Sequence, residues 1–180
     1  MPTEKGKILL PIARAAISCA LNTPRTADET APWLAERGAC FVTLTQQGQL
    51  RGCIGTLQAY RPLLDDVKSN AVSAALRDSR FAPLSAEELD ITRIEISLLS
   101  PPEAMDFRNE ADALAQLRPD EDGLIFECFH CRSTFLPQVW GQLPQPREFM
   151  AHLKHKAGLP VDFWSPEVKL SRYTVEKWKE

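Results

Sequence analysis

The sequence predicts an α+β fold in which mainly antiparallel sheets are flanked by helices. Apolar residues recur at helical spacing in residues 7–21 and 62–78. They alternate with polar residues at a period of two in residues 39–45, 50–57 and 91–100, as in half-buried strands. Strands outnumber the connections long enough for a parallel crossover, which favours antiparallel pairing. A chain of 180 residues buries about 70% of its unfolded surface, and it fits one domain or two small lobes.

The first half of the chain begins with the helix over residues 7–21, which Pro11 either kinks or starts. A helical turn over residues 32–37 is expected to end at Gly38, because glycine readily adopts the left-handed conformation of a helix C-cap. Residues 46–49 then form the turn of a hairpin between the first two strands.

The helix over residues 62–78 has Pro62 suited to its first turn. Ser85 and Glu88 have the spacing of a capping box for one further helical turn. The remaining predicted elements are the strand 91–100, a helix over 109–117, a hairpin of strands 124–128 and 133–136, a helix over 146–157, and a closing strand over 168–175.

Charge and cysteine content narrow the class of protein. The chain has 21 basic and 24 acidic residues and a formal net charge of -3, so its overall field repels nucleic acid. A local basic groove for a phosphate or a single nucleotide is left open. Five cysteines, an odd number, and no recognisable signal peptide predict a reducing, cytoplasmic compartment. No apolar run approaches the roughly 18 residues of a spanning helix, so no membrane anchor is expected.

The most informative stretch is residues 50–56, which places a cysteine and an arginine in a predicted strand. Because side chains alternate between the faces of a strand, Arg51 and Cys53 are expected on the same face. Gly52 and Gly55 weaken a strand, and they fit a place where another backbone or a ligand approaches closely. A guanidinium beside a cysteine favours the reactive thiolate, which makes Cys53 a candidate nucleophile. The alternative is that Cys53 packs as a small hydrophobic residue.

Two further features bear on this candidate. No histidine lies near Cys53 in the sequence, so a catalytic base would have to be placed by the fold. Cys19, in contrast, lies on the apolar stripe of the first helix, and it is predicted to be buried and unreactive.

A charged loop follows the helix over residues 62–78. Its Arg77 and Arg80 are candidates for binding a phosphate or a carboxylate, because a guanidinium fork matches both groups. The alternative is an ion-pair network with Asp78 that stabilises the turn. Gln138, which follows a proline at the end of a predicted strand, is a candidate for facing a cleft.

Cys128, His130 and Cys131 form a C-F-H-C motif at a predicted hairpin tip. Structural zinc requires four ligands, and the sequence has no second pair at matching spacing, so no metal is expected. A redox-active C-x-x-C pair is typically found at the start of a helix rather than at such a tip. The motifs of nucleotide, dinucleotide and serine-hydrolase sites are also missing from the sequence, and no cofactor is expected.

Several short motifs follow one another in a characteristic order. They are residues 50–55, 70–71, 77–81, 83–84, 94–97 with 101–102, 122–124, 135–139 and 156–160. In this order the chain resembles the AMMECR-type family, whose bacterial and archaeal members are called AmmeMemoRadiSam system protein A. The resemblance spans nearly the whole chain. Ser79, where the family's loop often has proline, and the hairpin tip around His130 depart from the family's pattern.

The resemblance implies one AMMECR-type domain over residues 1–180, built as two intertwined subdomains with a cleft beside the R-G-C-I-G segment. It also implies an association with a Memo-type protein related to ring-opening dioxygenases and with a radical SAM enzyme. It supplies no activity, because the biochemical function of the family is not established.

Two functions of different classes follow. In the first, the chain belongs to a modifying system that acts on a small anionic or nucleotide-like substrate. Cys53 is then the nucleophile or attachment point, Arg51 and Arg80 hold the anionic group, and Asn70 and Gln138 orient the substrate. In the second, the same cleft binds a ligand or a protein partner without catalysis. A base within hydrogen-bond reach of Cys53 would favour the enzyme.

Overall fold

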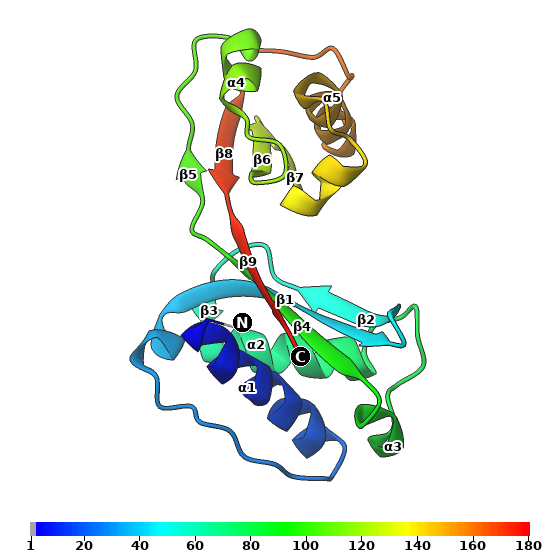
Figure 1. Cartoon of the computed structure of the whole chain (residues 1–180). Helices are drawn as coiled ribbons and strands as arrows, with labels where there is room; N and C mark the ends of the chain where they lie inside the picture. Colours follow the sequence, from blue (N-terminus) through cyan, green and yellow to red (C-terminus); the bar gives the residue numbers. More distant parts are fainter. Residues whose placement is uncertain (1–2) are drawn as a thin grey trace. The chain divides into compact units, whose positions relative to one another are not determined.

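The structure is a computed structural model that describes residues 3–180, and these divide into two compact units. The first unit comprises the described residues up to Leu99 together with Glu176–Glu180, and the second comprises Ser100–Val175. Each unit has its own antiparallel sheet with helices against it (Figure 1). The predicted α+β fold is therefore confirmed.

The sheet of the first unit has the strand order β2-β1-β4-β9, and β3 pairs with the start of β1. Its strands are β1 (Arg37–Gln46), β2 (Gln49–Gly55), β3 (Arg61–Pro62), β4 (Arg93–Leu99) and β9 (Val175–Lys179). The helices of this unit are α1 (Glu4–Ala20), η1 (Pro32–Ala35), α2 (Leu63–Leu76) and α3 (Ala86–Leu89).

One face of this sheet forms the core of the first unit. Alternate residues of β1, namely Cys40, Val42 and Leu44, are fully buried in a cluster with residues of α1 and α2. Residues of the other parity, such as Thr43, lie on the face away from the two helices and are half-buried. The alternation that predicted these strands therefore separates the face packed against α1 and α2 from the face turned away from them.

Local sequence signals explain the short connections of the first unit. Gln47 and Gly48 have φ values of 51° and 78°, the left-handed pair that a two-residue hairpin turn requires. The side chain of Ser85 accepts a hydrogen bond from the backbone N–H of Glu88 at 3.3 Å, which is the predicted cap of α3.

Three details of the first unit differ from the prediction. Helix α1 begins at Glu4, so Pro11 lies inside it rather than in its first turn. Gly38 does not cap a helix, because it is part of β1, where an added Cβ would lie 2.9 Å from the Leu63 side chain. Cys19 was predicted to be buried but is exposed near the C-terminal end of α1.

The sheet of the second unit has the order β5-β8-β6-β7. Its strands are β5 (Glu103–Ala104), β6 (Gly123–Cys128), β7 (Cys131–Phe135) and β8 (Lys169–Tyr173), and its helices are α4 (Glu110–Gln116), η2 (Pro137–Gly141) and α5 (Pro146–Lys156). In its core the rings of Trp140 and Phe149 stack with their centroids 3.8 Å apart. The Trp140 Nε1 group donates a hydrogen bond to the Asp122 carbonyl oxygen at 2.7 Å, so this buried ring has its polar atom satisfied.

The predicted closing strand over residues 168–175 corresponds to β8, and a further strand that was not predicted, β9, follows it in the other sheet. Strand β8 pairs with β6 in the second unit, whereas β9 lies beside β4 in the first. Thr174 separates them. The chain thus returns to the first unit at its end, and Trp178 of β9 packs in the core of that unit.

Candidate functional site

Cys53 lies in β2, the edge strand of the first sheet, and its side chain is half-buried. Its neighbour across the strand pair is Thr43 of β1. The Cys53 Sγ and the Thr43 Oγ1 are 3.2 Å apart and form a hydrogen bond. Because Gly52 and Cys53 alternate, and an added Cβ on Gly52 would point into α2, Cys53 lies on the face away from the helices.

The backbone of Cys53 is held at the free edge of the sheet by two side chains of the loop after α2. The Asp78 carboxylate accepts a hydrogen bond from the Cys53 N–H at 2.9 Å. Arg80 Nη2 donates to the Cys53 carbonyl oxygen at 3.4 Å. Together they occupy the donor and the acceptor that a neighbouring strand would otherwise use, which protects the edge.

Asp78 and Arg80 also hold each other. Arg80 Nε lies 3.0 Å from Asp78 Oδ1, and Arg80 Nη2 lies 2.7 Å from Asp78 Oδ2, a two-point ion pair. The Arg80 side chain and then the Cys53 N–H stabilise the carboxylate, so the pKa of Asp78 is far below its usual range. The hydrogen bond to Asp78 likewise raises the pKa of Arg80, and negative charge on Cys53 would raise it further.

Arg51 has a different set of contacts from the one expected. Its Nε and Nη2 atoms lie 3.0 and 2.9 Å from Glu88 Oε2, and its guanidinium carbon lies 5.9 Å from the centre of the Phe81 ring. The guanidinium carbon of Arg80 lies 5.5 Å from the same ring centre. The pairing of β1 and β2 is irregular next to Arg51, where a bulge interrupts the alternation that predicted its face. The guanidinium groups of Arg51 and Arg80 therefore both lie near the Phe81 ring. Of the two, Arg80 donates a hydrogen bond to the Cys53 carbonyl oxygen.

The two glycines of the segment are explained by close approaches within the protein. An added Cβ on Gly52 would lie 2.1 Å from the backbone oxygen of Ala74 in α2. On Gly55 it would lie 2.2 Å from the Phe41 ring. The α2 backbone thus fills the space beside Gly52, and the Phe41 ring fills the space beside Gly55. The sequence had left both spaces open to a ligand.

Asn70 belongs to a separate buried cluster of polar side chains. Its Nδ2 donates to the Cys40 carbonyl oxygen at 2.9 Å, to Thr56 Oγ1 at 3.0 Å and to Asp66 Oδ2 at 3.1 Å. Arg61 Nε pairs with Asp66 at 2.8 Å. These contacts tie α2 to the sheet, and they occupy the Asn70 side chain on the helix-covered side.

Arg77 and Gln138 complete the set of predicted site residues. Arg77 is exposed at the C-cap of α2, one residue before Asp78. Gln138 is exposed in η2 of the second unit, not at the end of a strand. The structure therefore brings Cys53, Arg51 and Arg80 together within the first unit. The cleft beside β2 stays a prediction.

Sequence reasoning missed two partners of this site. Thr43 was not singled out from the sequence, and Glu88 was named only as part of a capping box and not as a residue of the site. Thr43 alternates along its strand with the apolar residues Val42 and Leu44. Glu88 follows the capping serine, Ser85, by three residues. What was missing was the register that sets Thr43 opposite Cys53.

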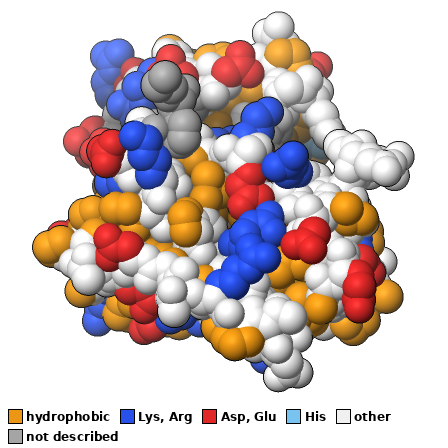
Figure 2. Space-filling model, turned by 60° about the horizontal axis from the view of Figure 1, so that its bottom comes forward, with side chains coloured by type: hydrophobic (Ala, Val, Ile, Leu, Met, Phe, Trp, Pro, Cys, Tyr) orange, Lys and Arg blue, Asp and Glu red, His pale blue; other side chains and the backbone are white. Residues whose placement is uncertain are grey.

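The described residues 3–180 contain no group of three or more His, Cys, Asp and Glu side chains placed to hold a metal ion. In the same range, no helix is both long and apolar enough to cross a bilayer. On the face drawn in Figure 2, basic and acidic side chains are interspersed with hydrophobic ones.

These observations define an α+β protein of two units with a half-buried cysteine in an edge strand, on the face away from helices α1 and α2. The chain belongs to the AMMECR1 family, which it matches over residues 10–178. The resemblance noted in the sequence is confirmed.

Relatives and a solved structure agree with this assignment. An archaeal protein of Methanothermobacter thermautotrophicus is 39% identical over 98% of this chain and 95% of its own length. Protein MJ0810 of Methanocaldococcus jannaschii is 36% identical over 98% of this chain and 90% of its own. The crystal structure of the uncharacterized protein PH0010 from Pyrococcus horikoshii is similar with a TM-score of 0.81 and 34% identity, covering 100% of this chain and 93% of that one.

Proposed function

We propose that this AMMECR1-family chain binds a small anionic ligand beside Cys53, with Arg80 as the residue that holds the anionic group. The observation that carries the proposal is that the Arg80 guanidinium is held in place by Asp78 and yet remains exposed to solvent. Its Nε and Nη2 atoms are fixed by Asp78, while its side chain remains 56% exposed. Among the described residues its Nη1 has no hydrogen-bond partner. A fixed, exposed guanidinium with free N–H groups is suited to a phosphate or a carboxylate.

Arg77 and Arg51 add to this site in different ways. Arg77 is exposed close by in the chain and contributes positive charge. Arg51 is neutralised by Glu88 at 2.9 Å, and it supports the Phe81 ring against which Arg80 lies. Neither Asn70, which is buried and bonded, nor Gln138, in the other unit, is part of the proposal.

Binding without catalysis is favoured by the surroundings of the Cys53 thiol. Its hydrogen-bond partner among the described residues is the Thr43 hydroxyl at 3.2 Å. A threonine hydroxyl does not serve as a general base near neutral pH, and a cysteine nucleophile requires one. The proposed role of Cys53 is therefore to line the binding site, in a reducing cytoplasm that keeps its thiol free.

The second candidate is the modifying system, in which Cys53 is the nucleophile or attachment point. It is favoured by the incomplete burial of Cys53 and by the hydroxyl group that lies within hydrogen-bond distance of its sulfur. A Memo-type protein and a radical SAM enzyme, proposed from the family resemblance, would then supply the remaining chemistry. A covalent adduct on the intact protein that maps to Cys53 and disappears in Cys53→Ala would support this candidate over simple binding.

The binding proposal is tested with inorganic phosphate, pyrophosphate and nucleoside monophosphates, by calorimetry and thermal melts. Wild type is expected to bind at least one of these anions. Arg80→Lys keeps a cation beside Asp78 but removes the Nη1 group proposed to contact the anion, so affinity should fall about tenfold or more, since a hydrogen bond to a charged group contributes about 1.5–3 kcal/mol.

Arg25→Lys is the matched control, because Arg25 is also exposed beside an acidic partner, Asp90, at 3.7 Å. It should leave affinity unchanged. Equal affinity of wild type and Arg80→Lys, or no binding of any anion, would leave Arg80 as a brace for the edge of β2 and would refute the proposal.

A further inference from the structure

The β6–β7 hairpin of the second unit carries two cysteines that the proposed function does not use. Cys128 and Cys131 are direct Cα partners across the two strands, with a turn of only Phe129 and His130 between them. Directly opposed residues of an antiparallel pair have Cα atoms about 4.5–5.5 Å apart. Disulfides join Cα atoms about 4.4–6.8 Å apart, so the Cα spacing typical of such a strand pair lies within the range that a disulfide spans.

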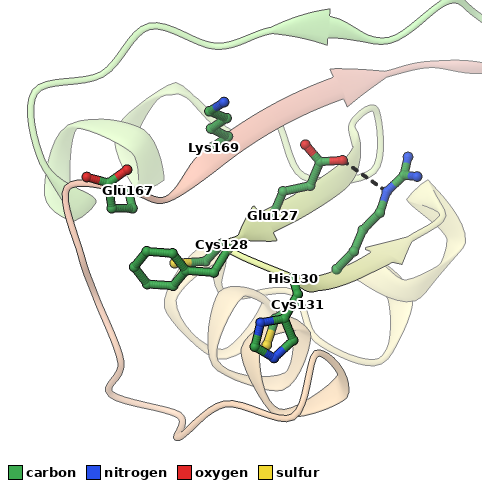
Figure 3. Close-up of a pocket in the computed structure, with 8 residues that line it drawn as sticks. Glu127, Cys128, His130, Cys131, Glu167 and Lys169 are labelled. Atoms are coloured by element: carbon green, nitrogen blue, oxygen red, sulfur yellow. Dashed lines mark ion pairs between the residues drawn. The ribbon is translucent and has the colours of Figure 1, made fainter.

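The two thiols differ in access. Cys128 is 2% exposed and packs in the core of the unit, whereas Cys131 is half-exposed. Both border a surface depression of about 400 Å³, which is also lined by His130, Glu167 and Lys169 (Figure 3). Burial, followed by the nearby charge of Cys131, raises the pKa of Cys128. Cys131 is therefore the more exposed residue of the pair, and Cys128 the more buried one.

We propose that Cys128 and Cys131 form a thiol–disulfide exchange site that accepts low-molecular-weight disulfides. In the first step the Cys131 thiolate attacks one sulfur of a small disulfide, which forms a mixed disulfide on Cys131 and releases one small thiolate. In the second step the Cys128 thiolate attacks the Cys131 sulfur, which forms the Cys128–Cys131 bond and releases the second small thiolate. The two cysteines lose two protons and two electrons, and the small disulfide is reduced to two thiols.

The order of the two steps follows from the structure. Cys131 is the more exposed of the two residues, so in the proposal it meets the incoming disulfide first. Cys128 is its direct partner across the hairpin, so it is the thiol placed to displace the bound group. Figure 3 shows the two sulfur atoms apart from each other, so the second step needs rotation about the Cα–Cβ bonds.

The test uses the full chain and oxidised glutathione as the probe, with free thiols blocked at each time point and the peptides identified by mass spectrometry. Wild type is expected to pass through a mixed disulfide on Cys131 and to end with an internal Cys128–Cys131 bond and no retained glutathione there. Exposed Cys19 is the internal reference, since it is expected to retain any glutathione that it acquires.

Two variants separate the attacking from the displacing thiol. Cys128→Ala should trap a stable mixed disulfide on Cys131, whereas Cys131→Ala should leave Cys128 modified at least tenfold more slowly. The wild-type time course gives the same information if Cys128→Ala does not fold. The proposal is wrong if Cys131 keeps its glutathione in wild type, if Cys128 is modified as fast as Cys131, or if no internal bond forms while Cys19 is modified.

Discussion

Asp78 is the residue on which the most contacts of the candidate site converge. A single carboxylate accepts from the Cys53 backbone and from two nitrogens of Arg80, and its side chain is 4% exposed. A buried charge is tolerated only when it is paired and hydrogen-bonded, and Asp78 meets both conditions. The position of Arg80, and with it the proposed anion site, therefore depends on Asp78.

We predict that Asp78→Asn destabilises the first unit by about 2 kcal/mol at pH 7, since hydrogen bonds to charged groups contribute about 1.5–3 kcal/mol. The pKa of Asp78 is lowered in the folded protein, so its stabilisation is complete above the unfolded pKa, near 4, and is lost as the pH falls through the folded value. The difference in the free energy of unfolding between wild type and Asp78→Asn should therefore become smaller below about pH 4. Urea unfolding across pH measures it.

Asp65→Asn provides the control for this experiment, because Asp65 is an exposed residue in the first turn of α2. Its cost should stay within about 0.5 kcal/mol, as for most surface substitutions. The role assigned to the Asp78 carboxylate would be contradicted if Asp78→Asn lowered the free energy of unfolding as little as Asp65→Asn does. It would also be contradicted if the loss caused by Asp78→Asn grew as the pH falls.

At the scale of elements, Gly52 sets how closely helix α2 approaches the sheet. The Ala74 carbonyl oxygen occupies the space that a side chain at position 52 would need. A backbone atom cannot rotate away as a side chain can, so either α2 or β2 must move when a methyl group is added. Since β2 carries Cys53, this packing also fixes the candidate site.

Gly52→Ala is predicted to destabilise the first unit by about 3 kcal/mol, at the upper end of the usual cost of overpacking. Gly141→Ala is the matched control, because no atom lies within 4 Å of an added Cβ there and its φ is not in the left-handed region. Denaturant unfolding of both variants tests this. Equal stability of the two would mean that α2 is not held against β2 as described.

Elements with local signals were predictable from the sequence. The β1–β2 hairpin follows from alternation and Gly48, and α2 from its apolar periodicity. The bulge at Arg51 was not predictable, because it depends on the register between two strands rather than on either strand alone. For the same reason Cys53 could be chosen from the sequence, but its hydrogen bond to Thr43 could not.

At the scale of the whole chain, the pairing of β9 was the main feature that the sequence did not predict. Residues 168–175 are typical of one closing strand, and the next apolar residue after Val175 is Trp178, a spacing of three that does not match the alternation of a strand. The partner of β9 is β4, far away in the sequence, and no local signal specifies such a pairing. The consequence is that the last five residues belong to the first unit, while the 76 residues of Ser100–Val175 form the second.

The cores of the two units share no residue, which allows their stabilities to be perturbed separately. Trp178 is 6% exposed in the first core, against Gly6 of α1, where an added Cβ would lie 2.6 Å from the indole ring. We predict that Trp178→Ala lowers the stability of the first unit by about 3–5 kcal/mol, the usual cost of truncating a buried tryptophan. Amide hydrogen exchange should then accelerate in β1 and β4 and stay slow in β6 and β8.

Trp140→Ala should give the reverse pattern, because that ring stacks on Phe149 in the core of the second unit. Exchange should accelerate in β6 and β8, while β1 and β4 keep their protection. If either variant accelerates exchange equally in both sheets, the chain unfolds as one cooperative unit and the separate cores do not define separate stabilities. If the two patterns are opposite, each core stabilises its own sheet, and the return of β9 contributes to the first unit alone.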